Sequence, residues 1–74
     1  MRRARRTKVP DATIVEVLLR GRAGHDPHDI AESLGLTPTY VNHIIGRRAR
    51  TNVRLNERFT SEELEAEIAL RKAG

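Results

Sequence analysis

At 74 residues the chain has room for one domain with a modest core, because a chain of this length buries only about 60% of its unfolded surface. It carries 14 Lys and Arg against 10 Asp and Glu, and it contains no cysteine. Disulfides and thiolate metal sites are therefore excluded. Its only aromatic residues, Tyr40 and Phe59, are too few for a protein that binds single strands by base stacking.

The charges are segregated along the chain. Residues 1–8 and 46–54 each hold several cations and no acid, whereas 57–67 is rich in glutamate. This separation is the pattern expected when one face of a protein meets phosphates and another does not. No apolar run is long enough to span a membrane or to act as a signal peptide, so we expect a cytoplasmic, nucleoid-associated protein.

Residues 1–8 are predicted to be a flexible basic arm, since they lack periodic apolar residues and their charges repel one another. The arm has three interpretations: a minor-groove arm, a nonspecific phosphate binder, or a solvated tail that aids solubility. The first two together are favoured. The cations assigned to phosphates or the minor groove are Arg2, Arg3, Arg5, Arg6, Lys8, Arg48 and Arg50.

A first helix is predicted to open at Pro10 with Asp11 as its N-cap, and to stop near Gly21 or Gly24. Its apolar stripe is wide, which indicates a helix with much of its surface in the core. The stripe consists of Ile14, Val15, Val17, Leu18 and Leu19.

Two further helices carry strong start signals. Asp26 and Thr37 are the predicted N-caps, and each is followed by a proline at the first helical position. Gly35 is expected to end the first of these helices in a left-handed turn. The residues expected to face inward are Ile30, Ala31, Leu34, Val41, Ile44 and Ile45.

Ala31, Gly35, Val41 and Ile44 meet the steric demands of two helices joined by a tight turn: a small residue at the contact, a glycine in the turn and branched residues inside. The stretch 30–45 resembles the helix-turn-helix of bacterial and phage DNA-binding proteins. The span 2–50 is similar to the DNA-binding domains of Hin-type serine recombinases and their homeodomain-like relatives.

This resemblance implies an all-α fold: a three-helix helix-turn-helix domain with a basic N-terminal arm and an extra C-terminal helix. It also implies that a recognition helix at 38–46 enters the major groove of duplex DNA. Asn42 has the chemistry to pair with adenine, and Arg47 the chemistry to reach guanine or phosphate. The candidate base contacts are Thr37, Thr39, Tyr40, Asn42, His43 and Arg47.

Residues 48–58 fit either a short strand within 51–56 or an extended linker, and could form a small wing beside the motif. Thr60 and Glu63 then form a predicted capping box, with Phe59 and Leu64 at the staple positions, and a last helix runs to about Lys72. Its narrow apolar stripe has two interpretations: a fourth core element, or a contact with a second chain. The stripe contains Leu64, Ile68 and, at its edge, Ala69.

Three segments result: the arm 1–8, the DNA-binding domain 9–50, and 51–74 as linker and helix. We expect a sequence-specific duplex-DNA-binding protein that regulates transcription in a bacterium or phage and forms a homodimer. The alternatives are an accessory factor for recombination or packaging, and an adaptor that docks a protein partner through the acidic C-terminal helix. His25 and His28 are read as solvated rather than metal-binding. No catalytic constellation, cofactor or small-molecule ligand is indicated.

Overall fold

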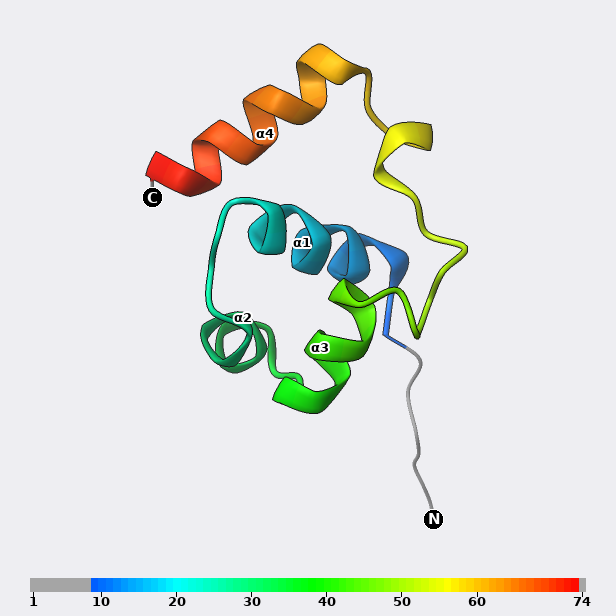
Figure 1. Cartoon of the computed structure of the whole chain (residues 1–74), viewed down its shortest axis with the longest axis vertical. Helices are drawn as coiled ribbons and strands as arrows, with labels where there is room; N and C mark the ends of the chain where they lie inside the picture. Colours follow the sequence, from blue (N-terminus) through cyan, green and yellow to red (C-terminus); the bar gives the residue numbers. More distant parts are fainter. Residues whose placement is uncertain (1–8, 74) are drawn as a thin grey trace.

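The computed structural model describes residues 9–73, and every regular element in that range is helical. The elements in chain order are α1 (Asp11–Arg22), α2 (Pro27–Leu34), α3 (Pro38–Ile45), the 3-10 helix η1 (Leu55–Glu57) and α4 (Ser61–Ala73). The prediction of an all-α fold is confirmed in this range (Figure 1). The predicted arm, 1–8, lies outside the described residues.

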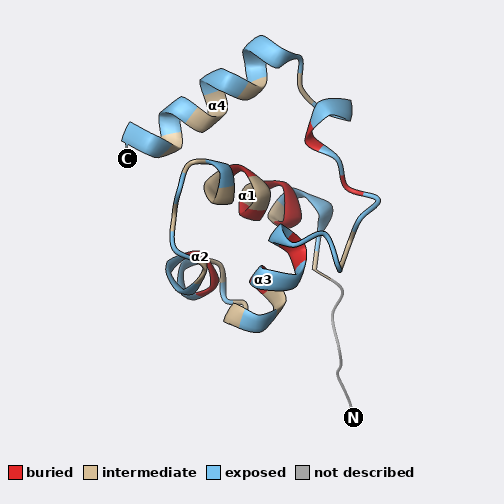
Figure 2. Ribbon diagram, in the orientation of Figure 1, coloured by how far each residue is buried: buried red, intermediate tan, exposed pale blue. Residues whose placement is uncertain are grey.

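The central element is α1, which lies between α4 on one side and the pair α2 and α3 on the other (Figure 1). This position explains its wide apolar stripe, because a helix contacted from two sides must bury more than one face. Ile14 and Val17 have no exposed surface, and Leu19 is 1% exposed. Val41 and Ile44 of α3 are also fully buried, and Ile30 and Ala31 of α2 are each 1% exposed, so α1, α2 and α3 share the core (Figure 2).

The irregular segment after α3 also belongs to this core. Val53 is 1% exposed and Leu55 6%, although the chain there has no long helix. The core therefore crosses the expected boundary between residues 50 and 51. The alternative of a short strand at 51–56 is wrong, because the described chain supplies no second strand to pair with it. The backbone forms η1 instead, and the Arg58 N–H donates to the Leu55 carbonyl at 3.0 Å.

Most helix ends follow the capping signals. Asp26 caps α2 by accepting a hydrogen bond from the His28 N–H at 2.8 Å. Before α4, the Thr60 hydroxyl accepts from the Glu63 N–H at 3.1 Å, and the Glu63 carboxylate accepts from the Thr60 N–H at 2.9 Å. This is the reciprocal pairing of a capping box, so the start of α4 is confirmed. α4 extends to Ala73, one residue beyond the expected end.

Asp11 does not cap α1, so that prediction is wrong. The N-cap is Pro10, and Asp11 is the first helical residue. The Asp11 carboxylate instead pairs with the guanidinium groups of Arg50 and Arg58, the latter at 3.3 Å. An acid in the first turn still complements the positive end of the helix dipole, but here it also ties α1 to the segment after α3.

Ile45 is likewise not an inward residue, since 36% of its surface is exposed. Val41 and Ile44 are three positions apart and share one face of α3, whereas Ile45 is turned a further 100° around the helix. Its side chain lies beside Gly21 of α1, where an added Cβ would come within 3.2 Å of the Ile45 Cδ1 atom. Ala69 of α4 is also exposed, which leaves Leu64 and Ile68 as the residues of its stripe that pack against the core.

Candidate nucleic-acid interface

The turn between α2 and α3 is fixed by backbone geometry. Gly35 adopts φ 72° and ψ 30°, in the left-handed region that favours glycine, and its N–H donates to the Ala31 carbonyl. The Leu36 N–H donates to the same carbonyl at 2.8 Å. Ala31 is 1% exposed, consistent with a small residue where α2 meets the core. The relative placement of α2 and α3 thus follows from one glycine and one alanine.

The orientation of α3 follows from its cap and its buried face. The Thr37 hydroxyl accepts a hydrogen bond from the Tyr40 N–H at 3.1 Å, and Pro38 occupies the first helical position. Because Val41 and Ile44 are held in the core, the side of the helix opposite them faces solvent. Three polar candidates are exposed there: Thr39, Asn42 and His43.

Tyr40 and Arg50 are held against other parts of the molecule. Tyr40 is half-buried against the core, and Arg50 pairs with the Asp11 carboxylate. The nearby Tyr40 side chain, followed by Asp11, raises the pKa of Arg50. Arg50 also donates from Nη1 to the Val9 carbonyl at 2.7 Å. These two candidate DNA contacts therefore lie in a network that joins α3, the following loop and the start of α1.

The basic loop (46–54) is shaped by residues with left-handed backbones. Gly46 is the C-cap of α3, and both Arg47 (φ 60°) and Arg50 (φ 55°) have positive φ, which is unusual for residues with a side chain. The Arg47 guanidinium donates from Nη2 to the carbonyls of Thr51 at 3.1 Å and Val53 at 2.8 Å. Arg47 therefore braces the loop that carries Val53 into the core.

The surface around α3 and the basic loop is cationic. From residue 33 to residue 56 the sequence contains no Asp or Glu. Arg48 is exposed, and within residues 9–73 it makes no ion pair. Asp11 reaches this surface and pairs with Arg50, and Glu57 lies 3.8 Å from Arg54, so cations exceed acids there without excluding them. An excess of cations attracts phosphates over a range of about 8–10 Å at moderate salt.

Glu16 of α1 and Glu67 of α4 lie where these two helices meet, and both are paired with arginines. The Glu16 carboxylate accepts two hydrogen bonds from Arg71, at 2.9 and 2.8 Å, and one from Arg20 at 2.7 Å. Arg71 also donates to Glu67 at 2.8 Å. The His25 Nε2 atom lies 2.9 Å from the Arg71 carbonyl oxygen, at the end of α4. We name Glu16, Arg20, Glu67 and Arg71 the α1–α4 ion cluster.

The ion cluster shifts the protonation of its central acid. The hydrogen bond from Arg71 lowers the pKa of Glu16 to about 2, with a smaller contribution from Arg20 and partial opposition from burial. Glu16 and Glu67 raise the pKa of Arg71 in turn. The charged forms are therefore favoured in the folded state, and α4 is attached to α1 by electrostatics as well as by apolar contact.

The predicted site residues thus fall into separate groups. Thr37, Thr39, Asn42 and His43 share the exposed part of α3, and Arg48 is exposed just beyond it. Arg47, Arg50 and Tyr40 have intramolecular contacts. Leu64 and Ile68 pack against the core, which favours the core interpretation of α4. The arm residues Arg2, Arg3, Arg5, Arg6 and Lys8 lie outside the described range.

Two features of the structure had no counterpart among the predicted sites. The ion cluster joins Glu16 to Arg71, 55 residues apart, and no local pattern could have paired them. Arg54 and Arg58 are exposed cations of the segment that follows α3, and they were not assigned a role either. The only feature of the sequence that could have suggested a role in phosphate binding is that they lie at and just beyond the end of the basic run 46–54.

Among residues 9–73, no helix is both long and apolar enough to cross a membrane, and no group of three or more metal-ligating side chains comes together. The whole sequence was compared with protein-family models, curated proteins and solved structures, and it matches none of them.

Proposed function

We propose that this protein binds duplex DNA in a sequence-specific manner, with α2 and α3 acting as a helix-turn-helix and α3 as the recognition helix. The observation that carries the proposal is the exposure of Thr39, Asn42 and His43 on a short helix whose other face is fixed by Val41 and Ile44. The major groove of DNA admits one α-helix, and polar side chains on such a helix can meet base edges.

The chemistry of the exposed α3 residues fits base readout. Asn42 can form paired hydrogen bonds with adenine, and Thr39 can offer a hydroxyl to a base or phosphate and a methyl group to thymine. His43 can donate or accept a hydrogen bond. The Thr37 hydroxyl is occupied as an acceptor by the cap, but its own hydrogen stays available for donation to a phosphate.

The arginines near α3 differ in the intramolecular contacts that they would lose on binding DNA. Arg48 is exposed and can reach phosphate without losing a contact within the described chain. Arg47 would have to release the Thr51 and Val53 carbonyls before it reached DNA, so its main role is to shape the loop. Arg50 is tied to the Asp11 carboxylate and to the Val9 carbonyl. Arg48 and the arm 1–8 are therefore the proposed phosphate contacts, the arm along the backbone or in the minor groove.

Transcriptional control in a bacterium or phage is the biological role that we propose, through occupancy of a site on DNA. An accessory role in recombination or packaging would use the same surface. A homodimer would read two half-sites about one helical turn apart, which compensates for the small contact area of a single recognition helix. Because Leu64 and Ile68 face the core, the outer side of α4 is where a second copy would bind.

A second candidate function rests on that outer side. Leu70 is 67% exposed, and it lies on a helix whose exposed positions include Glu62, Glu63 and Glu65. An exposed leucine on a helix that also carries exposed acids fits an adaptor that docks a basic, apolar partner through α4. In that case the cationic surface of α3 would be incidental.

The first experiment is selection from random duplexes at near-physiological salt with the full chain. Enrichment of one motif would support sequence-specific binding, and a palindromic motif would support a symmetric dimer. Retention without enrichment would indicate an architectural protein held by its cations. Absence of retention would contradict DNA binding and favour the adaptor.

Replacement of Asn42 by alanine tests the role of α3 directly. Asn42→Ala should weaken binding to the selected site by about 1–3 kcal/mol, because one base contact is lost, while binding to random DNA changes little. Fluorescence anisotropy with both duplexes measures the difference. The matched control is Asn56→Ala, an exposed asparagine of η1, which should leave both affinities unchanged. Equal losses in the two variants would contradict base readout by α3.

A further inference from the structure

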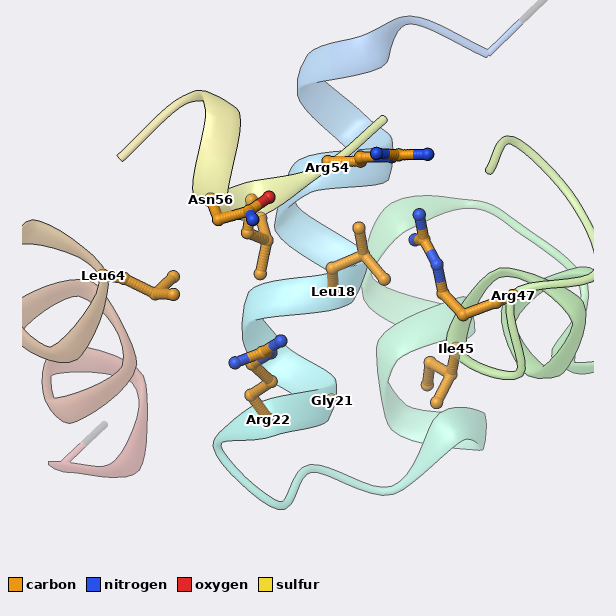
Figure 3. A pocket seen from close by; sticks show the side chains of 9 residues that line it. Leu18, Gly21, Arg22, Ile45, Arg47, Arg54, Asn56 and Leu64 are labelled. Carbon is orange, nitrogen blue, oxygen red and sulfur yellow. The ribbon is translucent and has the colours of Figure 1, made fainter. Parts of the chain in front are cut away.

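A groove of about 540 Å³ opens between α1, the end of α3 and the start of α4. Leu18 and Gly21 of α1 form its floor, Ile45 of α3 lies at one side, and Leu64 of α4 lies at the other (Figure 3). Gly21 matters here because an added Cβ would come within 3.2 Å of the Ile45 side chain. The glycine therefore lets α3 approach α1 closely at one edge of the groove.

The groove is apolar inside and only partly covered. Leu55 is buried beneath it, Leu18 and Leu64 are half-buried, and Ile45 is 36% exposed. Ile45 and Leu70 are the large apolar residues of the described chain that are most exposed, and only Ile45 lies in a groove. Covering this surface with apolar atoms would contribute about 25 cal/mol for each Å² removed from water.

The rim of the groove is cationic. Arg22, Arg47 and Arg54 line it together with Asn56, and none of its lining residues is acidic. Arg54 has one ionic partner, Glu57, at 3.8 Å, and both side chains are more than 60% exposed, so that pair is weak. Figure 3 shows Arg47 and Arg54 on the side of the groove opposite Leu64. Positive charge thus lies at one side and apolar surface in the middle.

We propose that this groove binds a small amphipathic carboxylate of the size of a medium-chain fatty acid. The carboxylate would accept hydrogen bonds from Arg54, whose planar guanidinium group suits a two-oxygen acceptor. Arg47 keeps its contacts with the Thr51 and Val53 carbonyls and adds positive charge beside Arg54. The apolar body would lie over Leu18, between Ile45 and Leu64. The volume lies within the range of about 300–1,000 Å³ that is usual for small-molecule sites.

The site does not depend on the proposed function. Its contacts belong to α1, α3, α4 and the loop that follows α3, and the ligand chemistry is recognised by arginine and apolar surface alone. The experiment therefore contains no DNA, and its failure would leave the DNA-binding proposal untouched.

Decanoate is the probe, titrated into the full chain labelled with ¹⁵N and followed by amide chemical shifts. We expect saturable shifts at Leu18, Gly21, Ile45 and Leu64. Octanoate should bind about 15-fold more weakly, since it lacks two CH₂ groups and each buried CH₂ contributes about 0.8 kcal/mol. Decanol and decyltrimethylammonium, which have similar chains without a carboxylate, should bind much more weakly than decanoate.

Arg54→Gln is the informative variant, because Arg54 is exposed and supports no buried contact. It should weaken decanoate binding about fivefold through loss of a charge-assisted hydrogen bond, with little change in stability. Arg48→Gln is the matched control, since Arg48 belongs to the same loop and does not line the groove. It should leave decanoate binding unchanged.

Three results would overturn the proposal. These are an absence of saturable shifts at the groove, equal binding of decanol and decanoate, and equal weakening by Arg54→Gln and Arg48→Gln. The last two would show that chain length or general positive charge, rather than the arginine rim, determines binding.

Discussion

α3 and α4 are both short surface helices, yet they are attached to the molecule by different forces. α3 places Val41 and Ile44 fully in the core, whereas α4 has no fully buried residue and packs through the half-buried Leu64 and Ile68. The α1–α4 ion cluster adds ion pairs that hold α4 against α1. Apolar burial does not depend on protonation and is not screened by salt, while ion pairs respond to pH and are screened by salt. The attachment of α3, the proposed recognition helix, should therefore change less with pH and salt than the attachment of α4.

The largest expected effect on stability comes from truncating a buried side chain of α3. Ile44→Ala should lower the free energy of unfolding by about 2–5 kcal/mol, because it removes a fully buried side chain and leaves a cavity. Ile68→Ala on α4 should cost roughly 1–2 kcal/mol, since Ile68 is only half-buried. Urea denaturation of both variants measures the contrast, with Leu70→Ala as an exposed control that should change stability by less than about 0.5 kcal/mol. Equal losses of stability in Ile44→Ala and Ile68→Ala would contradict the idea that α3 and α4 are attached by different forces.

The next effect concerns the ion cluster. Glu16→Gln should lower stability by about 2 kcal/mol, because it leaves Arg71 and Arg20 without their shared carboxylate. Hydrogen exchange should show faster opening of α4 with little change in α3. Glu62→Gln is the control, since Glu62 is exposed and makes no ion pair within the described chain. An equal loss of protection in both helices would mean that α4 is not attached independently.

Acid should act on the same attachment. The pKa of Glu16 in the folded protein is lowered from 4.5 to about 2, so its contribution is fully present above pH 4.5 and is lost as the pH falls toward 2. Urea midpoints across this window should fall for the wild type and less steeply for Glu16→Gln. Parallel slopes for the two proteins would show that Glu16 is not the group being protonated.

The smallest effect is expected at the start of α4. Thr60→Ala removes the hydroxyl that accepts from the Glu63 N–H and should cost about 1 kcal/mol. Exchange should increase in the first turn of α4 alone. Ser61→Ala, which changes a neighbouring hydroxyl outside the capping box, should have a smaller effect. A larger loss of stability in Ser61→Ala than in Thr60→Ala would mean that Ser61, one residue later, is the N-cap.

The helices were predictable from the sequence because their signals are local. Asp26, Thr37 and the Thr60–Glu63 pair act on backbone groups within three positions, and Gly35 acts on its own turn. A cap therefore marks the start of a helix whatever the rest of the chain does. Asp11 is the instructive failure, because a distant arginine competed for the carboxylate that the local pattern assigned to a cap.

The candidate site was predictable only in part. The exposed residues of α3 follow from its periodicity, since fixing Val41 and Ile44 inward leaves Thr39, Asn42 and His43 outside. The roles of the arginines do not follow from periodicity. The guanidinium group sits at the end of a long side chain, and its partner is decided by whichever acceptors the fold brings near.

The sequence by itself determined where α2, α3 and α4 start, the turn at Gly35 and the separation of basic from acidic segments. Only the tertiary structure decided that Arg50 pairs with Asp11 across 39 positions and that Glu16 pairs with Arg71 across 55. It also decided that Ile45 faces a groove rather than the core. The physical reason is range: caps and periodicity act within a few residues, whereas ion pairs and grooves form between segments that meet only after folding.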